Sequence, residues 1–399
     1  MGLGEASTIG ESCPGNGGFQ PRNHLIAMAP RAPKRTPALR VTGAIEGFWA
    51  MFGNAIAHLR RGADQPFHAH EVSWFLRFAL LYFIAASILV GSLVGLNAVA
   101  VPAMGGGINF FFFIRDVLLG VFPVLIVLFI VIGWQRIKLR GGALLKVFAA
   151  CVIMQSGFTM MKGSLPMLMP FYADPFFADL DLALHGVDPW VWAHGLIGMG
   201  EGQKLFLAYT TLWGVWALLF PVILVVVDSD RARVKRFMIL FLSAWVLLGN
   251  VVAFGGLSVG PIFYDRLLGG ERFAGLIAVL NDGGIQQTTI GMTQDALWRL
   301  YSQGAESIGS GISAFPSVHV AVASVAAFYL AERSRWLALP GFGYLALVLF
   351  LSVYTGYHYA VDGYASILVI GALWAALKWH AAARSARAES PAGALAPAE

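Results

Sequence analysis

Residues 205–227 read LFLAYTTLWGVWALLFPVILVVV, a run without a charged side chain. A helix rises about 1.5 Å per residue and the hydrocarbon core of a bilayer is about 30 Å thick, so about 20 apolar residues are enough to cross it. Similar runs lie at residues 74–98, 110–134, 143–161, 237–258, 316–330, 336–357 and 359–379. The sequence therefore predicts an all-α fold, a polytopic membrane helix bundle with about eight transmembrane helices.

The composition of the whole chain agrees with a membrane protein. Hydrophobic residues make up 58% of the 399 residues and charged residues only 12%, whereas soluble domains carry about 25% charged residues. So little charge cannot cover a water-exposed surface of this size, which excludes soluble, disordered and nucleic-acid-binding classes. The two cysteines are too few for a disulfide framework.

The lysines and arginines indicate which ends of the spans face the cytoplasm, because positively charged loops are retained there. Every second loop is basic. The loops after the second, fourth and sixth spans carry Arg136, Lys138, Arg140, Lys146, Arg231, Arg233, Lys235, Arg236, Arg333 and Arg335. We expect both termini to be cytoplasmic, the opposite loops to be periplasmic, and the protein to lie in a bacterial inner membrane.

The chain divides into three parts by composition. Residues 1–72 are predicted to be a cytoplasmic basic tail, and residues 380–399 a disordered cytoplasmic tail. Residues 73–379 are the predicted transmembrane domain and carry the candidate catalytic residues. Within the first tail, apolar residues at helical spacing predict a helix over residues 44–61, which either lies in the membrane interface or packs on the bundle.

The first candidate site segment is GSGISAFPSVH at residues 309–319. Its Gly and Ser residues let the backbone curl, and Pro316 suits the first turn of the helix that follows. The unpaired amides and positive dipole end of such a helix start favour an anion, above all phosphate. His319 is predicted to lie beside this anion site.

The second segment is GYHYAVD at residues 356–362. A spacing of four residues puts His358 and Asp362 on one helical face, where the carboxylate can fix the imidazole tautomer and raise its nucleophilicity. A lone histidine at a membrane interface is more often a structural hydrogen-bonding group. The interpretation as a site therefore depends on the two segments occurring together.

Both histidines are expected on one face of the membrane. One crossing down and one crossing up separate His319 from His358, so the two return to the same side whatever the total number of spans. Lys162, Arg266 and Arg299 lie on loops or span ends that face the same way. Two imidazoles, a carboxylate and several cations suit phosphoryl transfer.

These motifs resemble those of the type 2 phosphatidic acid phosphatase superfamily of membrane lipid phosphatases and phosphotransferases. Residues 313–319, SAFPSVH, look like its Pro-Ser-x-His motif, and residues 356–362 look like its Gly-x-His-x-x-x-Asp motif. The resemblance implies that His358 is the nucleophile that forms a phosphohistidine, that Asp362 orients it, and that His319 protonates the leaving alcohol. Ser317 is expected at the phosphate.

The sequence departs from the phosphatases in two places. Ser352 stands where they usually place an Arg, and their Lys-x6-Arg-Pro motif is absent. In both departures the sequence resembles the inositol phosphorylceramide synthase branch. Residues 162–166, 170–175, 179–181 and 260–264 are similar to bacterial members of that branch. Phosphate neutralisation is then expected from Lys162, Arg266 or Arg299.

The resemblance implies a lipid phosphotransferase or phosphatase with a lipid substrate, acting at the periplasmic face and requiring no cofactor. The transferred group would be a phospho-headgroup of the inositol phosphate type, passed to a lipid alcohol. Hydrolysis of phosphatidic acid or an isoprenoid phosphate is one alternative, and a non-enzymatic transporter or scaffold is another. Asp174, Asp179 and Asp181 are interpreted as helix caps in preference to a metal site.

Overall fold

The computed structural model describes residues 65–96, 129–130, 132–302 and 311–389, together with residues 53, 99, 115, 119, 122 and 126. All of them belong to one compact unit, Met51–Glu399. The predicted helix over residues 44–61 and most of the predicted span 110–134 lie outside the described residues.

The part of the chain that the structure describes contains six helices that are long and apolar enough to cross a membrane. They are built from α2 (Ser73–Leu93) with the 3-10 turn η1 (Ala69–Val72), α4 (Trp134–Leu168), α7 (Met199–Leu207) with the π-helical turn η2 (Ala208–Leu212) and α8 (Trp213–Val227), α9 (Arg231–Leu242) with the π-helical segment η3 (Ser243–Val252), α14 (Arg335–Tyr354) and α15 (Ala360–Glu389). The predicted all-α membrane helix bundle is confirmed. The protein is a multi-pass membrane protein.

Helix α13 (Val318–Arg333) lies in the middle of this bundle. It has 16 residues, and its side chains from Val320 to Tyr329 are all buried. Close packing explains how a helix this short is held. A Cβ atom added to Gly341 of α14 would come within 3.3 Å of the Ala327 backbone, and small residues of this kind let membrane helices approach each other closely.

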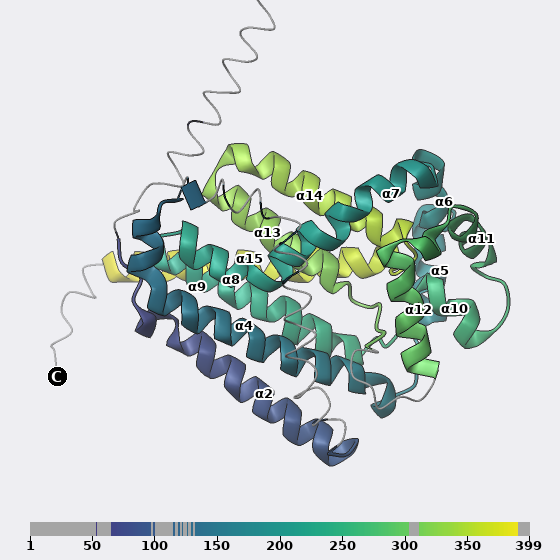
Figure 1. Cartoon of the computed structure of the whole chain (residues 1–399), viewed down its shortest axis with the longest axis horizontal. Coiled ribbons are helices and arrows are strands. Elements are labelled where there is room, and N and C mark those ends of the chain that lie inside the picture. Colours follow the sequence, from purple (N-terminus) through teal and green to yellow (C-terminus); the bar gives the residue numbers. More distant parts are fainter. Residues whose placement is uncertain are drawn as a thin grey trace, which may run out of the picture. The chain divides into compact units, whose positions relative to one another are not determined.

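Short helices gather at one end of the long ones (Figure 1). They are α5 (Asp174–His185), α6 (Pro189–Leu196), α10 (Pro261–Leu268), α11 (Ala274–Asp282), the 3-10 turn η4 (Ile285–Gln287) and α12 (Thr289–Ser302). Helices α13 and α15 both begin at this end, because α14 runs back between them. The fold therefore places the two predicted motifs under the layer of short helices.

The opposite end of the bundle is held by buried charges. Arg140 near the start of α4 donates to the carbonyls of Val225 (2.8 Å) and Asp228 (2.7 Å) at the end of α8. The Asp228 carboxylate accepts from Arg233 of α9 at 2.6 Å and lies 3.4 Å from Arg333 of α13. Residues of three predicted basic loops therefore meet at one end, as the alternation of charge predicts.

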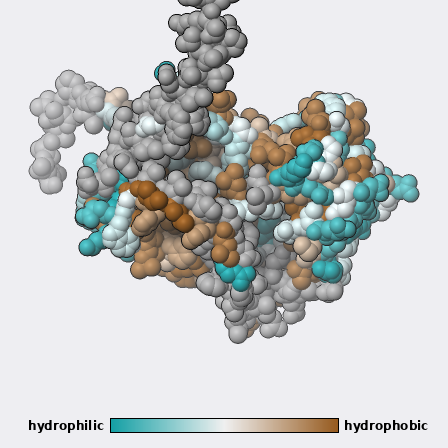
Figure 2. Space-filling view, turned by 45° about the horizontal axis from the view of Figure 1, so that its top comes forward, coloured by the Kyte–Doolittle hydropathy of each residue, from teal (hydrophilic) through white to brown (hydrophobic). Residues whose placement is uncertain are grey.

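The outer surface of the bundle is apolar in its middle. Figure 2 shows brown hydrophobic side chains across the centre of the visible face and teal hydrophilic side chains at both ends. On α2, Leu81 and Ile88 expose 68% and 67% of their surface. Exposed aliphatic side chains on a spanning helix are suited to contact with lipid acyl chains.

The two ends of the bundle are expected on opposite sides of the membrane. Single cysteines replacing Glu271, in the exposed loop before α11, and Arg335, at the exposed start of α14, would test this in a background without Cys13. Cys151 is buried and serves as an internal control. An impermeant maleimide should label position 271 in intact spheroplasts and position 335 only after permeabilisation. Labelling of both positions from one side would contradict the predicted topology.

Candidate active site

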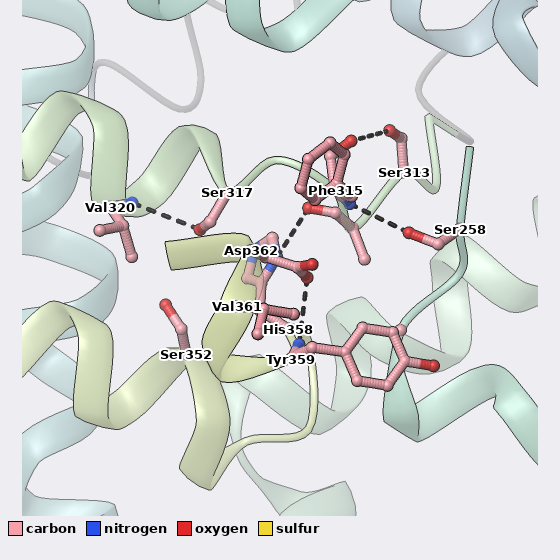
Figure 3. A network of polar contacts seen from close by, with 12 residues as sticks. Ser258, Ser313, Phe315, Ser317, Val320, Ser352, His358, Tyr359, Val361 and Asp362 are labelled. Atoms are coloured by element: carbon pink, nitrogen blue, oxygen red, sulfur yellow. Dashed lines mark hydrogen bonds and ion pairs between the residues drawn. The ribbon is translucent and has the colours of Figure 1, made fainter. Parts of the chain in front are cut away.

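His358 lies in the short segment between α14 and α15, opposite the segment that leads into α13 (Figure 3). Its ring Nδ1 lies 2.9 Å from the carbonyl oxygen of Ala314 and 3.3 Å from Oδ2 of Asp362. A carbonyl can only accept, so Nδ1 must carry the proton and donate it. In the neutral ring the lone pair is then on Nε2, the nitrogen that a nucleophilic histidine needs.

Asp362 holds the segment around His358 from within. Its Oδ2 accepts from the backbone N–H of Tyr359 at 3.0 Å, in addition to its contact with the imidazole. The predicted spacing of four residues therefore brings His358 and Asp362 together. The Asp362 side chain is fully buried.

His319 lies in the first turn of α13, with its ring centroid 5.8 Å from that of His358. The fold therefore brings the two predicted histidines together. Its ring is sandwiched between Trp213, at 4.0 Å, and Tyr209, at 4.8 Å, both nearly parallel to it. Trp213 also donates its indole N–H to the His319 carbonyl at 3.1 Å. Stacking therefore sets the orientation of this imidazole.

Ser317 is the N-cap of α13. Its hydroxyl oxygen accepts from the Val320 N–H at 3.3 Å, and its own N–H donates to the Asp362 carbonyl at 3.2 Å. The Ser317 side chain is fully buried and does not line the cavity described next. Ser317 thus joins the start of α13 to α15, and a direct contact with phosphate stays a prediction.

A cavity of about 330 Å³ opens in front of the two histidines. Aromatic and aliphatic side chains form most of its wall, among them Trp213, Trp245 and Phe263, and Thr289 and Thr293 of α12 line it as well. Of the lysine and arginine side chains in the described residues, Lys162 alone lines it. The Lys162 ammonium donates to the Ser313 carbonyl at 3.1 Å, and its remaining N–H groups are suited to an anionic ligand.

The other two predicted cations lie elsewhere. Arg266 of α10 is 3.8 Å from Asp295 and its side chain is 41% exposed, and Arg299 of α12 is exposed. Neither lines the cavity that contains the histidines. Of the three predicted cations, the fold brings only Lys162 to them.

The environment of His358 favours the neutral imidazole. Burial, followed by the neighbouring His319 and Lys162, holds the pKa of His358 well below its usual value. A lowered pKa means that the ring stays unprotonated at neutral pH, and protonation would require a more acidic medium. The Nε2 lone pair is therefore available.

The two buried aspartates of α5 bind backbone amides. Asp174 accepts from Val259 (2.8 Å) and Gly260 (3.0 Å), and Asp181 accepts from Ala360 (2.7 Å) and Val361 (3.0 Å). No group of three or more potential metal ligands is found among the described residues. Neither of these aspartates caps its own helix α5, whose N-cap is Ala173. Asp181 caps α15 and Asp174 binds amides just before α10, while the third predicted cap, Asp179, is exposed.

Several site residues carry no signal in the sequence. The Ala314 carbonyl is a backbone group, and any residue type could supply it. Tyr209 and Trp213 lie within a continuous apolar run, where aromatic residues usually serve as packing. Which tautomer His358 adopts follows only from the structure, because the Ala314 carbonyl that selects it is 44 residues away in the sequence.

Residues 202–376 match the family model described as PAP2 superfamily. This matched segment, residues 202–376, is similar to the PAP2 superfamily, and we refer to it as the PAP2 domain. No curated protein and no solved structure matched the chain.

The PAP2 domain includes both histidines, Asp362 and the aromatic sandwich of His319, and excludes Lys162 and the two buried aspartates of α5. Ser352, where the phosphatases usually place an Arg, is buried within it, and its hydroxyl lies 3.3 Å from that of Tyr209. The Ser352 hydroxyl also donates to the Val348 carbonyl at 2.8 Å. The position at which the phosphatases usually place an Arg is therefore occupied by the Ser352 hydroxyl, paired with that of Tyr209.

Lys162→Gln should lower kcat/KM for an anionic lipid roughly 10- to 100-fold, because a charge-assisted hydrogen bond contributes about 1.5–3 kcal/mol. Arg299→Gln is the matched control, since Arg299 lies outside the cavity, and it should retain nearly full activity. An equal loss of kcat/KM in the two variants would contradict a specific role of Lys162 in the cavity.

Proposed function

We propose that this protein is an enzyme that transfers a phosphoryl or phospho-headgroup from a membrane lipid through a phosphohistidine on His358. The observation that supports it most is the hydrogen bond from His358 Nδ1 to the Ala314 carbonyl. It leaves Nε2 as the free nitrogen at a cavity that also holds His319 and Lys162. Covalent catalysis needs a nucleophile oriented in this way.

The proposed reaction has two steps. His358 Nε2 attacks the phosphorus atom, the bond from phosphorus to the leaving alcohol breaks, and His319 gives its proton to the departing oxygen. In the second step the hydroxyl oxygen of an alcohol or of water attacks the phosphorus atom, and the bond from phosphorus to His358 Nε2 breaks. This releases the neutral His358 imidazole, and His319 takes up the proton of the attacking hydroxyl. The aromatic faces of Trp213 and Tyr209 are suited to stabilise the positively charged imidazole that the first step requires.

The charge lining the cavity favours a phosphodiester donor. Lys162 supplies one positive charge, and Ser352 replaces the Arg that would bring a second. A phosphodiester carries one negative charge and a phosphomonoester up to two, so a site that lacks this Arg and adds only Lys162 to the His319 imidazolium matches the diester better. We therefore infer a phosphotransferase, with a headgroup of the inositol phosphate type as the donor and a lipid alcohol as the acceptor.

The apolar wall of the cavity supports a lipid acceptor. Aromatic and aliphatic side chains give water few hydrogen-bonding partners, while a lipid alcohol can bury its chain against them. A lipid phosphate phosphatase differs only in that water attacks in the second step. It is the second candidate, supported by the exposure of Thr293 at the cavity wall, where water can reach.

The reaction is proposed to take place at the periplasmic face of a bacterial inner membrane. Basic side chains of the loops after the second, fourth and sixth predicted spans lie at the end of the bundle opposite the histidines. Positive residues are retained in the cytoplasm, so the other end is the periplasmic one. Substrates would enter from the outer leaflet.

His358→Ala should abolish turnover, and Asp362→Asn should lower it about 10²-fold, since misplacing a reacting group by about 1 Å can cost 10²-fold in rate. His380→Ala is the control, because that histidine is exposed near the end of α15. The purified protein would be assayed with phosphatidic acid, and with phosphatidylinositol plus diacylglycerol or ceramide. Free phosphate and new lipid are both followed.

Headgroup transfer from the diester, lost in His358→Ala, is the expected result. Rapid phosphate release from phosphatidic acid without any transfer would replace the transferase by the phosphatase. Normal turnover of any substrate by His358→Ala would remove the phosphohistidine mechanism, and with it the proposed function.

A further inference from the structure

The segment that carries His358 is held mainly from outside. It links α14 to α15 through residues 355–359, and the His358 N–H reaches only the Ser352 carbonyl at 3.2 Å. The position of the imidazole on this segment therefore depends on the contacts that fix the end of α14 and the start of α15. The two buried aspartates of α5, outside the PAP2 domain, contact the C-terminal end of this segment.

Asp181 caps α15 from another helix. Its Oδ2 accepts from Ala360 at 2.7 Å and its Oδ1 from Val361 at 3.0 Å, the first two amides of α15. The residue before the helix is Tyr359, whose phenol cannot cap its own helix in the way that Ser, Thr, Asp or Asn can. Asp181 supplies the missing acceptor and so fixes where α15 begins, two residues after His358.

Asp174 connects the two sides of the imidazole. It accepts from the Tyr359 hydroxyl at 2.9 Å on one side and from the amides of Val259 and Gly260 on the other. The preceding residue, Ser258, accepts from the amides of Ala314 and Phe315 through its carbonyl and hydroxyl oxygens (Figure 3). Ala314 in turn accepts from His358 Nδ1.

These contacts form a closed circuit of hydrogen bonds around the nucleophile. Going round it, Tyr359 is tied to Asp174, Asp174 to the segment that includes Ser258, Ser258 to Ala314, and Ala314 to His358. Asp174 is 1% and Asp181 2% exposed. Packing supports the same arrangement, since Phe177 of α5 stacks on Phe315 at 4.3 Å.

We propose that Asp174 and Asp181 are positioning residues that hold the His358 imidazole against the Ala314 carbonyl, and so fix its Nε2 toward the substrate. The inference rests on the proposed function, because it assigns these aspartates to the same nucleophile. Neither residue reaches the cavity wall, so both act through His358 and make no contact with the substrate.

The test uses Asp174→Asn and Asp181→Asn in the full-length protein. Each carboxylate accepts from two backbone N–H groups, one on each oxygen, so an amide in either orientation turns its own NH₂ group towards a donor. The segment should shift, and misplacement of a reacting group by about 1 Å can cost 10²-fold in rate. We expect kcat and the rate of phosphohistidine formation to fall about 10²-fold while KM and the melting temperature stay near the wild-type values.

Two further variants keep the test decisive if either asparagine variant folds poorly. Asp179→Asn, an exposed aspartate on the same helix, should behave as wild type. Tyr359→Phe removes the one hydroxyl that joins the nucleophile segment to Asp174 and should lower kcat roughly 10-fold. Combining Tyr359→Phe with Asp174→Asn should cost no more than Asp174→Asn alone, because both break the same circuit.

The outcomes separate this inference from the proposed function. If His358→Ala is inactive while Asp174→Asn, Asp181→Asn and Tyr359→Phe keep wild-type kcat, the positioning role is wrong and the function stands. A fall in melting temperature with unchanged kcat would likewise reduce the aspartates to structural residues. Full activity of His358→Ala would overturn the proposed function itself.

Discussion

The hydrogen bond from His358 Nδ1 to the carbonyl of Ala314 is the contact on which the rest of the site depends. A histidine can react through either ring nitrogen, and the partner of one decides the chemistry of the other. A backbone carbonyl cannot donate, so this partner allows one neutral tautomer only. Asp362 contacts the same protonated Nδ1. Lys162 and His319 line the cavity at which Nε2 then carries the lone pair.

The contact joins residues 44 positions apart in the chain, and the path of the helices between them makes it possible. Helix α14 has to run the length of the bundle and return the chain to the end where α13 began. The short and buried α13 makes this compact, because small side chains let α14 and α15 pack directly against it. At the far end, the Arg140, Asp228 and Arg233 network joins the ends of α4, α8 and α9.

Much of the architecture could be predicted from the sequence, because the cost of exposing a polar backbone to lipid makes long apolar runs helical. The parity of the spans predicts that His319 and His358 share one face of the membrane, and helical spacing predicts the pairing of His358 with Asp362. The sequence could not predict which cation lies beside the histidines. Lys162, Arg266 and Arg299 all lie towards the same end, and only the packing of α10 and α12 decides that two of them turn away from the cavity.

The contacts that complete the site are those between distant segments and those made by backbone atoms. Ser317, predicted at the phosphate, caps α13. The sequence could not distinguish these two roles, because a serine before a helix suits both an N-cap and a phosphate ligand. The link from α5 to the start of α15 spans 179 residues, and no local periodicity encodes it. Backbone acceptors such as Ala314 have no residue preference at all.

The position of the phosphoryl group on the trapped intermediate tests the central claim most directly. The protein would be quenched in base during incubation with substrate and digested, and the isomer of any phosphohistidine determined by tandem mass spectrometry and ³¹P NMR. Because Nδ1 is engaged with Ala314, the phosphoryl group should be found on Nε2 of His358. Phosphorylation of Nδ1, or of a residue other than His358, would contradict the account.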